Sequence, residues 1–199
     1  MKSRSPWISI SDLLSGVVLI LLLLFVMAAI VPQYTEEANR QDMMNQLNDT
    51  LKEYQDAGQI KVHIETGMLE FTSVTFESGS ALLAPATKSA VRDLAAKLKR
   101  YMDENNRMEI LIEGHTDPAA IKQVINRGGY FSDNIQLSTL RAANVRAELL
   151  THLGTEYAKR IGVAGYGETR LRNTQYPLSP ENRRIEIRIL WNGQKEKKD

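Results

Sequence analysis

Ile10-Ser11-Asp12-Leu13-Leu14 opens the stretch that decides the fold, because an uncharged, apolar run follows it as far as Val31. At about 1.5 Å per residue, a helix over residues 13–31 is roughly 28 Å long, close to the thickness of a bilayer core. The run therefore predicts a membrane-spanning helix. Asp12 lies at its start, where a carboxylate costs about 2.5–3.5 kcal/mol to insert unless it is paired, hydrated or protonated. Position alone leaves two interpretations equal: Asp12 is a functional ion carrier, or it marks the headgroup-level end of the span.

The residues around the apolar run predict its orientation. Lys2 and Arg4 precede it, and Glu36 and Glu37 follow it. The positive-inside rule then places the N-terminus in the cytoplasm and the bulk of the chain outside it. A cleaved signal peptide is the competing interpretation, but the run is longer than such peptides use, and Val31-Pro32-Gln33 lacks a small-x-small cleavage site. We therefore expect an uncleaved anchor.

Composition limits the classes of protein that the chain can belong to. Its 199 residues suit one globular domain with appendages. A formal net charge of +1 gives no indication of nucleic-acid binding, and the absence of cysteine excludes disulfides and thiolate chemistry. The sequence shows no nucleophile–base set and no phosphate-binding loop. We therefore expect neither an enzyme nor a bound cofactor.

The polar segment after the anchor has a helical period. Its apolar residues are Met44, Leu47, Leu51 and Tyr54, spaced three, four and three apart. Such a stripe is typical of a weak parallel pair of helices, which predicts a homodimer through residues 40–56. A solvated linker helix is the alternative, and it stays open.

The remainder of the chain alternates between strand and helix periodicity. Strands are indicated where apolar and polar residues alternate, and helices where apolar residues recur every three or four positions. The order predicts an α+β fold in which helices pack on a mixed β-sheet. The expected elements are a hairpin over 60–76 turning at Thr66-Gly67, a helix opened by Pro85, a strand from Met108, an irregular stretch over 118–136, a helix capped by Ser138, and strands over 160–165 and 184–189.

Residues 59–191 contain five short motifs in a fixed order. They are Phe76-Glu77-Ser78-Gly79-Ser80, Glu113-Gly114-His115-Thr116-Asp117, Leu137-Ser138-Thr139-Leu140-Arg141-Ala142, Gly165-Tyr166-Gly167-Glu168 and Asn182-Arg183-Arg184-Ile185-Glu186. In these motifs and their order, this part of the chain resembles the OmpA-like peptidoglycan-binding domains, which implies a domain that binds the cell wall. One departure is Pro118-Ala119-Ala120, at a place where a glycine usually follows the Thr-Asp motif, and the loop after it is longer.

The N-terminus resembles a second family. Residues 6–13, Pro-Trp-Ile-Ser-Ile-Ser-Asp-Leu, are similar to the start of MotB-type stator subunits, and most similar to the ZorB subunits of Zorya anti-phage defence. The resemblance implies that Asp12 carries the translocated ion, and that two B chains sit inside a ring of five MotA-like or ZorA-like subunits. Ser11 and Ser15 add oxygens that suit sodium, but serine is common in helices, so protons are favoured. Zorya-type defence, a flagellar stator and a passive tether between membrane and wall remain as alternatives.

The family match also names residues of a wall-binding site. Diaminopimelate in the wall peptide presents an ammonium and a carboxylate, so its site needs one anion and one bidentate cation. By the match these are Asp117 and Arg141. The expected supporting residues are Thr116, Asn182 and, of two arginines that alternate in direction, Arg183.

The local sequence favours an anion beside Arg141. With Ser138 as N-cap, Arg141 falls in the first helical turn, where a bound carboxylate suits both the guanidinium and the free helix N–H groups. The alternative is a structural pair between Arg141 and Asp117. His115 and Asp117 suggest a metal, but no third ligand is spaced to help, so we expect none.

These predictions divide the chain into five parts. We expect a single-pass protein of the bacterial inner membrane, with a cytoplasmic N-terminus and a periplasmic C-terminal domain. In resting stators the segment after the anchor acts as a plug, and the resemblance implies the same role here. The parts are a cytoplasmic N-terminus (1–7), a transmembrane helix (8–32), a helical linker or plug (33–58), the OmpA-like domain (59–191) and a charged tail (192–199).

Overall fold

The computed structural model describes residues 6–72, 76, 80–119, 121, 124–126 and 129–191. The chain divides into two compact units, Met1–Asp42 and Met43–Asp199. The expected charged tail over 192–199 lies outside the described residues.

The first unit contains the apolar helix that the sequence predicts. Helix α1 (Pro6–Thr50) begins at a proline, which suits the first turn of a helix because its missing N–H has no partner there. Its stretch Ile10–Val31 has a mean hydropathy of 3.1 and is long enough to cross a membrane. None of that stretch is buried against the rest of the chain. The expected N-terminal apolar helix is therefore confirmed.

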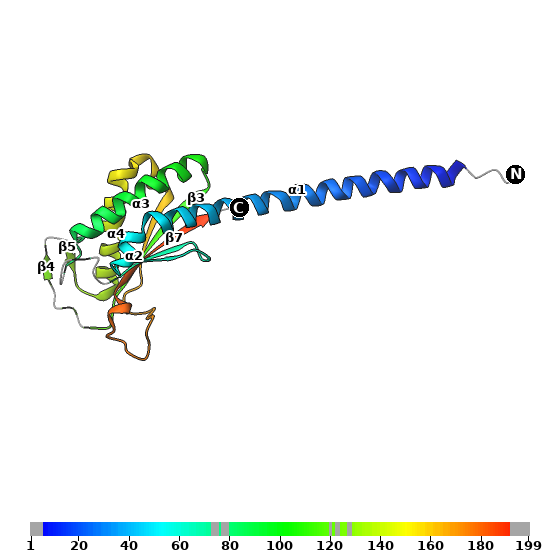
Figure 1. The fold of residues 1–199 in the computed structure, drawn as a ribbon. Coiled ribbons are helices and arrows are strands. Elements are labelled where there is room, and N and C mark those ends of the chain that lie inside the picture. The colour runs from blue at the N-terminus through cyan, green and yellow to red at the C-terminus, as the bar shows by residue number, and fades with distance from the viewer. Residues whose placement is uncertain are drawn as a thin grey trace. The chain divides into compact units, whose positions relative to one another are not determined.

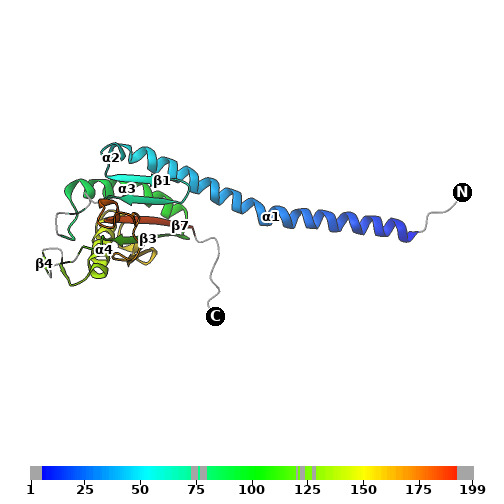
Figure 2. The same ribbon diagram turned by 90° about the horizontal axis from the view of Figure 1, so that it is seen from below.

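A five-stranded sheet forms the centre of the second unit (Figures 1 and 2). The strands lie in the order β1-β2-β7-β3-β6, and β3 with β6 is the parallel pair in an otherwise antiparallel sheet. The mixed sheet that the sequence predicts is confirmed. The strands are β1 (Ile60–His63), β2 (Met68–Phe71), β3 (Met108–His115), β6 (Ile161–Gly165) and β7 (Arg184–Trp191).

Helices α3 (Pro85–Glu104) and α4 (Asn134–Leu153) pack on one face of this sheet and close a single core with it. Pro85 opens α3 as expected. The start of α4 differs from the prediction: its N-cap is Asp133, whose Oδ1 accepts a hydrogen bond of 2.7 Å from the backbone N–H of Gln136. Ser138 lies inside the helix and is fully buried.

The end of α1 and the short helix α2 (Lys52–Asp56) belong to the second unit's core. Met44, Leu47 and Leu51 are 0% exposed within a single chain. The Tyr54 hydroxyl donates to Asp93 of α3 at 2.7 Å. The prediction that this stripe joins two chains is therefore wrong for the state seen here, because the same side chains already pack inside one chain.

Smaller elements complete the unit. The stretch 118–136, expected to be irregular, contains a two-stranded sheet of β4 (Val124–Asn126) and β5 (Gly129–Phe131). Two 3-10 helices, η2 (Thr155–Arg160) and η3 (Pro180–Asn182), lead into β6 and β7.

The face of the sheet away from α3 and α4 carries charged side chains, because core isoleucines alternate with charged residues along β7. Strand register places Glu70 of β2, Glu186 of β7 and Glu113 of β3 side by side, which we call the glutamate row. Each is at most 3% exposed. Arginines surround the row: Arg172 donates to Glu70, Arg184 to Glu186, and Arg188 to both Glu113 and Glu186.

Candidate functional site

Asp117 and Arg183 meet where two neighbouring strands end. Asp117 follows β3 and Arg183 precedes β7, and the register of this antiparallel pair sets His115 opposite Arg184. An Arg183 Nη1 consequently lies 2.6 Å from an Asp117 Oδ2. Asp117 is 8% exposed, whereas the Arg183 side chain is 38% exposed and faces solvent in part.

Arg141 reaches the same region from α4. Its Nε and Nη2 both donate to the carbonyl oxygen of Ser80, at 3.2 and 3.1 Å, and its guanidinium lies 4.8 Å from the centre of the Phe76 ring. Burial, aided by the charge of Arg183 and opposed by that of Asp117, lowers the pKa of Arg141 to about 10. Arg141 is therefore charged at neutral pH, and its charge interacts with those of Asp117 and Arg183.

The two sequence interpretations of Arg141 need correction. Because α4 begins at Asn134, Arg141 lies in the helix interior. The free N–H groups of the first turn are therefore too far away to bind the same carboxylate as Arg141. Within the described residues, Asp117 forms its ion pair with Arg183, while Arg141 donates to the Ser80 carbonyl. Sequence reasoning missed Ser80 and the ring of Phe76, although both belong to the first of the five motifs.

Thr116 contributes an unused hydroxyl group. Its side chain is 3% exposed, and its Oγ1 has no hydrogen-bond partner among the residues that the structure describes. Leaving a buried hydroxyl unpaired costs about 1–3 kcal/mol. Thr116 directly precedes Asp117 in the chain, so its hydroxyl is, among the described residues, an unused hydrogen-bonding group in the loop after β3.

Asn182 serves the loop that leads to Arg183 rather than the site directly. Its Oδ1 accepts from the backbone N–H groups of Arg172 and Asn173, and its Nδ2 donates to the carbonyls of Asn173, Tyr176 and Pro177. The side chain is 0% exposed. Asn182 thus fixes the position of the neighbouring Arg183.

Two glycines let α4 approach the sheet closely enough to place Arg141. A Cβ on Gly165 would lie 2.0 Å from Thr139 Oγ1, and one on Gly114 would lie 2.1 Å from the Ser138 carbonyl oxygen. The buried Ser138 hydroxyl accepts from the N–H of Gly167 at 2.9 Å. These contacts join α4 to the loops after β3 and β6, which explains the small residues in three of the motifs.

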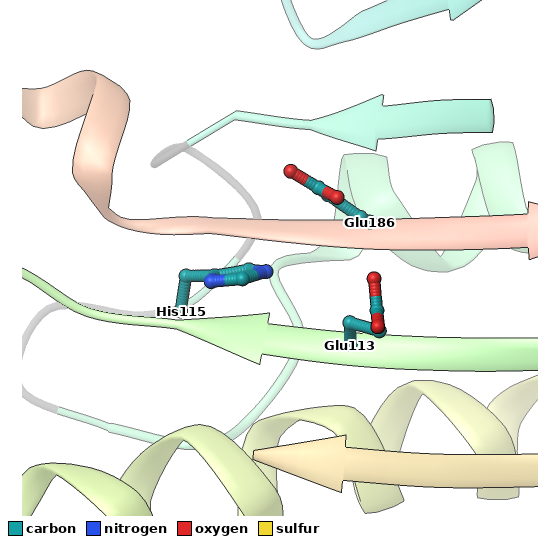
Figure 3. A group of neighbouring side chains, drawn as sticks. All are labelled: Glu113, His115 and Glu186. Carbon is teal, nitrogen blue, oxygen red and sulfur yellow. The ribbon is translucent and has the colours of Figure 1, made fainter. Parts of the chain in front are cut away.

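A second cluster lies next to the site on the outer face of the sheet. Figure 3 shows His115 pointing toward Glu113 and Glu186, and their ligand atoms lie within 4.8 Å of one another. Sequence spacing did not indicate this cluster, because Glu186 lies far from His115 in the sequence and comes from the neighbouring strand β7, and Asp117 is not part of it. Arginine side chains nevertheless contact both carboxylates: Arg188 Nη2 and Arg184 Nε lie 2.7 and 2.8 Å from Glu186 oxygens. Because arginine guanidinium groups already neutralise the carboxylates that a metal ion would bind, we assign no metal here.

His115 is the neutral member of this cluster. It is 3% exposed, and its ring stacks on Tyr166 with 5.4 Å between ring centres. Burial lowers the pKa of His115 to about 4, aided by the charge of Arg184 and opposed by Glu186 and Glu113. The imidazole is uncharged at neutral pH.

Asp12 lies in the other unit, in α1 within the apolar stretch Ile10–Val31. Its predicted role as ion carrier depends on a membrane and a partner subunit. That role stays a prediction.

Comparisons with known proteins show the family of the second unit. Residues 75–184 match the model of the OmpA family. A truncated flagellar export/assembly protein, LafU of Escherichia coli K12, is 33% identical over 115 residues, which are 58% of this chain and 49% of LafU. The chain thus spans about half of that relative.

Solved structures share the fold. A MotB-like protein from Desulfovibrio vulgaris has a TM-score of 0.56 and 26% identity, with 79% of this chain and 97% of that chain covered. The cell wall anchor of the T6SS from Pseudomonas aeruginosa has a TM-score of 0.55 at 20% identity, with 73% and 96% covered. At that identity the second likeness shows the fold alone.

The family match covers more than half of the chain and includes every residue of the candidate wall site. OmpA-like domains bind peptidoglycan and are non-enzymatic, in agreement with the expectation that the chain is not an enzyme. The protein is a member of the OmpA family, with an N-terminal helix long and apolar enough to anchor it in a membrane.

Proposed function

We propose that the chain is the B-type subunit of an ion-driven rotary stator and that it holds the complex to peptidoglycan through Asp117, Arg141 and Arg183. The observation that carries the wall-binding part is the ion pair between Asp117 and Arg183, whose charges both act on the Arg141 guanidinium. The three side chains come from the loop after β3, the residue before β7 and helix α4. Diaminopimelate offers the matching pair: its ammonium suits Asp117, and its carboxylate suits Arg141.

Peptidoglycan pulldown tests this site. In the unit 43–199, Asp117→Ala and Arg141→Ala each leave one charge of the ligand unpaired, so we expect a loss of retention that corresponds to tenfold or more in affinity. Arg92→Ala on α3 is the matched control, since that side chain is 59% exposed and pairs with its neighbour Asp93. Circular dichroism checks folding. Equal retention of folded Asp117→Ala, Arg141→Ala and wild type would refute the site.

The stator part rests on Asp12, which a passive tether would not need. A carboxylate at the start of an apolar span is costly, and such residues usually mark ion pathways. In the complex with its MotA-like or ZorA-like partner, Asp12→Asn should abolish ion flux and leave assembly intact, because the amide is nearly isosteric but carries no ion. Asp12→Glu is the control that keeps the charge. Normal flux in Asp12→Asn would favour the passive tether.

Within the stator class we favour Zorya-type defence driven by protons, on the resemblance of residues 6–13 to ZorB subunits. The flagellar alternative is favoured by the 33% identity to LafU and by the MotB-like structure. Phage protection and swimming, each measured in a deletion strain carrying the chain and its partner, separate the two. Replacing sodium by potassium in the medium separates sodium from proton dependence.

A further inference from the structure

A small pocket adjoins the candidate wall site and shares one residue with it. It has a volume of about 110 Å³ and lies between the hairpin β1–β2 and the start of β7. Its charged lining consists of Lys61, Glu70, Glu181, Arg183 and Arg184. Arg183 therefore both contacts Asp117 and lines this pocket.

The inner charges of the pocket are already satisfied by partners outside it. Glu70 is 2% exposed and accepts from Arg172, and the buried Arg184 donates to Glu186 at 2.8 Å. The charges left at the rim are those of Lys61, Arg183 and Glu181. The Lys61 side chain is 56% exposed and its Nζ lies 3.9 Å from Glu70, a distance at which the attraction is weak.

Occupation of the wall site would change the charge of this rim. An ammonium bound at Asp117 competes with Arg183 for the Oδ2 atom that Arg183 now contacts at 2.6 Å. The released guanidinium already lines the pocket. The rim would then carry two positive charges, from Lys61 and Arg183, and one negative charge, from Glu181. The pocket would gain a net preference for an anion.

We propose that this pocket is a second subsite, which binds a carboxylate of the residue next to diaminopimelate in the same stem peptide. The proposal rests on the wall-binding function proposed above. Both neighbours can supply the group, because γ-linked D-glutamate keeps a free α-carboxylate and the terminal D-alanine ends in one. The subsite couples to the first site through Arg183. A diaminopimelate derivative that is acetylated and amidated at one of its two amino-acid ends keeps a single ammonium and a single carboxylate, so it engages only the first site.

Calorimetric titration of the full chain in detergent tests the subsite with defined probes. For the stem tetrapeptide, Lys61→Ala should weaken binding about threefold to fivefold, the range of a partly exposed ion pair. Glu181→Gln should strengthen binding by a similar factor, because it removes the opposing charge. Neither change should alter binding of the diaminopimelate derivative blocked at one end. Lys97→Ala, at an exposed lysine on α3, is the matched control.

Two altered peptides identify the carboxylate. If the effect of Lys61→Ala disappears for a peptide with amidated D-glutamate, the ligand is the α-carboxylate of D-glutamate. If the effect disappears for a tripeptide lacking D-alanine, the ligand is the terminal carboxylate. An effect that persists in both would overturn the proposal, as would an equal effect on the diaminopimelate derivative blocked at one end. Unchanged tetrapeptide binding in Lys61→Ala, with binding lost in Arg141→Ala, overturns the subsite and leaves the wall site intact. No loss in Arg141→Ala would overturn both.

Discussion

Replacing Leu47 by alanine tests whether the end of α1 is part of the domain core. Leu47 is 0% exposed and packs in the same core as α3 and the sheet. Truncation of a leucine in such a place costs about 2–5 kcal/mol, from lost transfer free energy and the cavity left behind. A domain of this size has a stability of about 5–15 kcal/mol, so the loss is a large fraction of the total.

Urea unfolding of the unit 43–199, followed by far-ultraviolet circular dichroism, measures this loss. We expect a lower midpoint at an unchanged slope, which identifies a change of stability rather than of compactness. Asn45→Ala is the matched control on the same helix, because Asn45 is exposed and alanine favours helices. The samples are held at a concentration where sedimentation shows monomers. An unchanged midpoint for Leu47→Ala in those monomers would refute the packing of Leu47 in the core of one chain. It would favour instead the interpretation that this stripe joins two chains.

Three further outcomes follow from the site. Because the folded-state pKa of His115 lies near 4, below its ordinary 6.5, stability should fall by about 2 kcal/mol between pH 7 and pH 5, and His115→Phe should flatten that part of the urea-unfolding profile. Gly165→Ala should destabilise by about 1–3 kcal/mol and weaken peptidoglycan binding, since its Cβ meets Thr139 at 2.0 Å, whereas Gly162→Ala on the same strand meets its nearest atom at 3.4 Å and should be tolerated. Asn182→Ala should lower the free energy of unfolding by about 2 kcal/mol or more, because five hydrogen bonds to the loop are lost; a thermal melt equal to wild type would contradict its role.

Local patterns predicted the elements well. Pro85 marked the start of α3, the alternation from Met108 marked β3, and the uncharged run before Val31 marked the apolar part of α1. Each of these signals depends on neighbours in the sequence: a fixed proline φ, a period of two, or a long stretch without charge. The α+β class followed from their order.

Partner choice was harder to predict, because it depends on segments far apart in the chain. Nothing local distinguishes a stripe that meets another chain from one that meets α3, and Met44, Leu47 and Leu51 show the second case. Ser138 has the side chain of a good cap, but Asp133 supplies the hydrogen bond. The contact of Arg141 with Ser80 spans 61 residues, so only the motif order could have indicated it.

The glutamate row has a consequence for how the sheet selects its pairing during folding. Buried ion networks add little net stability, since desolvation of the charges offsets most of their attraction. A slip of β7 by one residue, however, would turn Glu186 toward the aliphatic interior and separate it from Arg184 and Arg188, leaving uncompensated carboxylates. A one-residue slip is thus disfavoured by the unpaired carboxylates that it would bury. The charged face of the sheet therefore helps to fix the register between β3, which ends two residues before Asp117, and β7, which begins directly after Arg183.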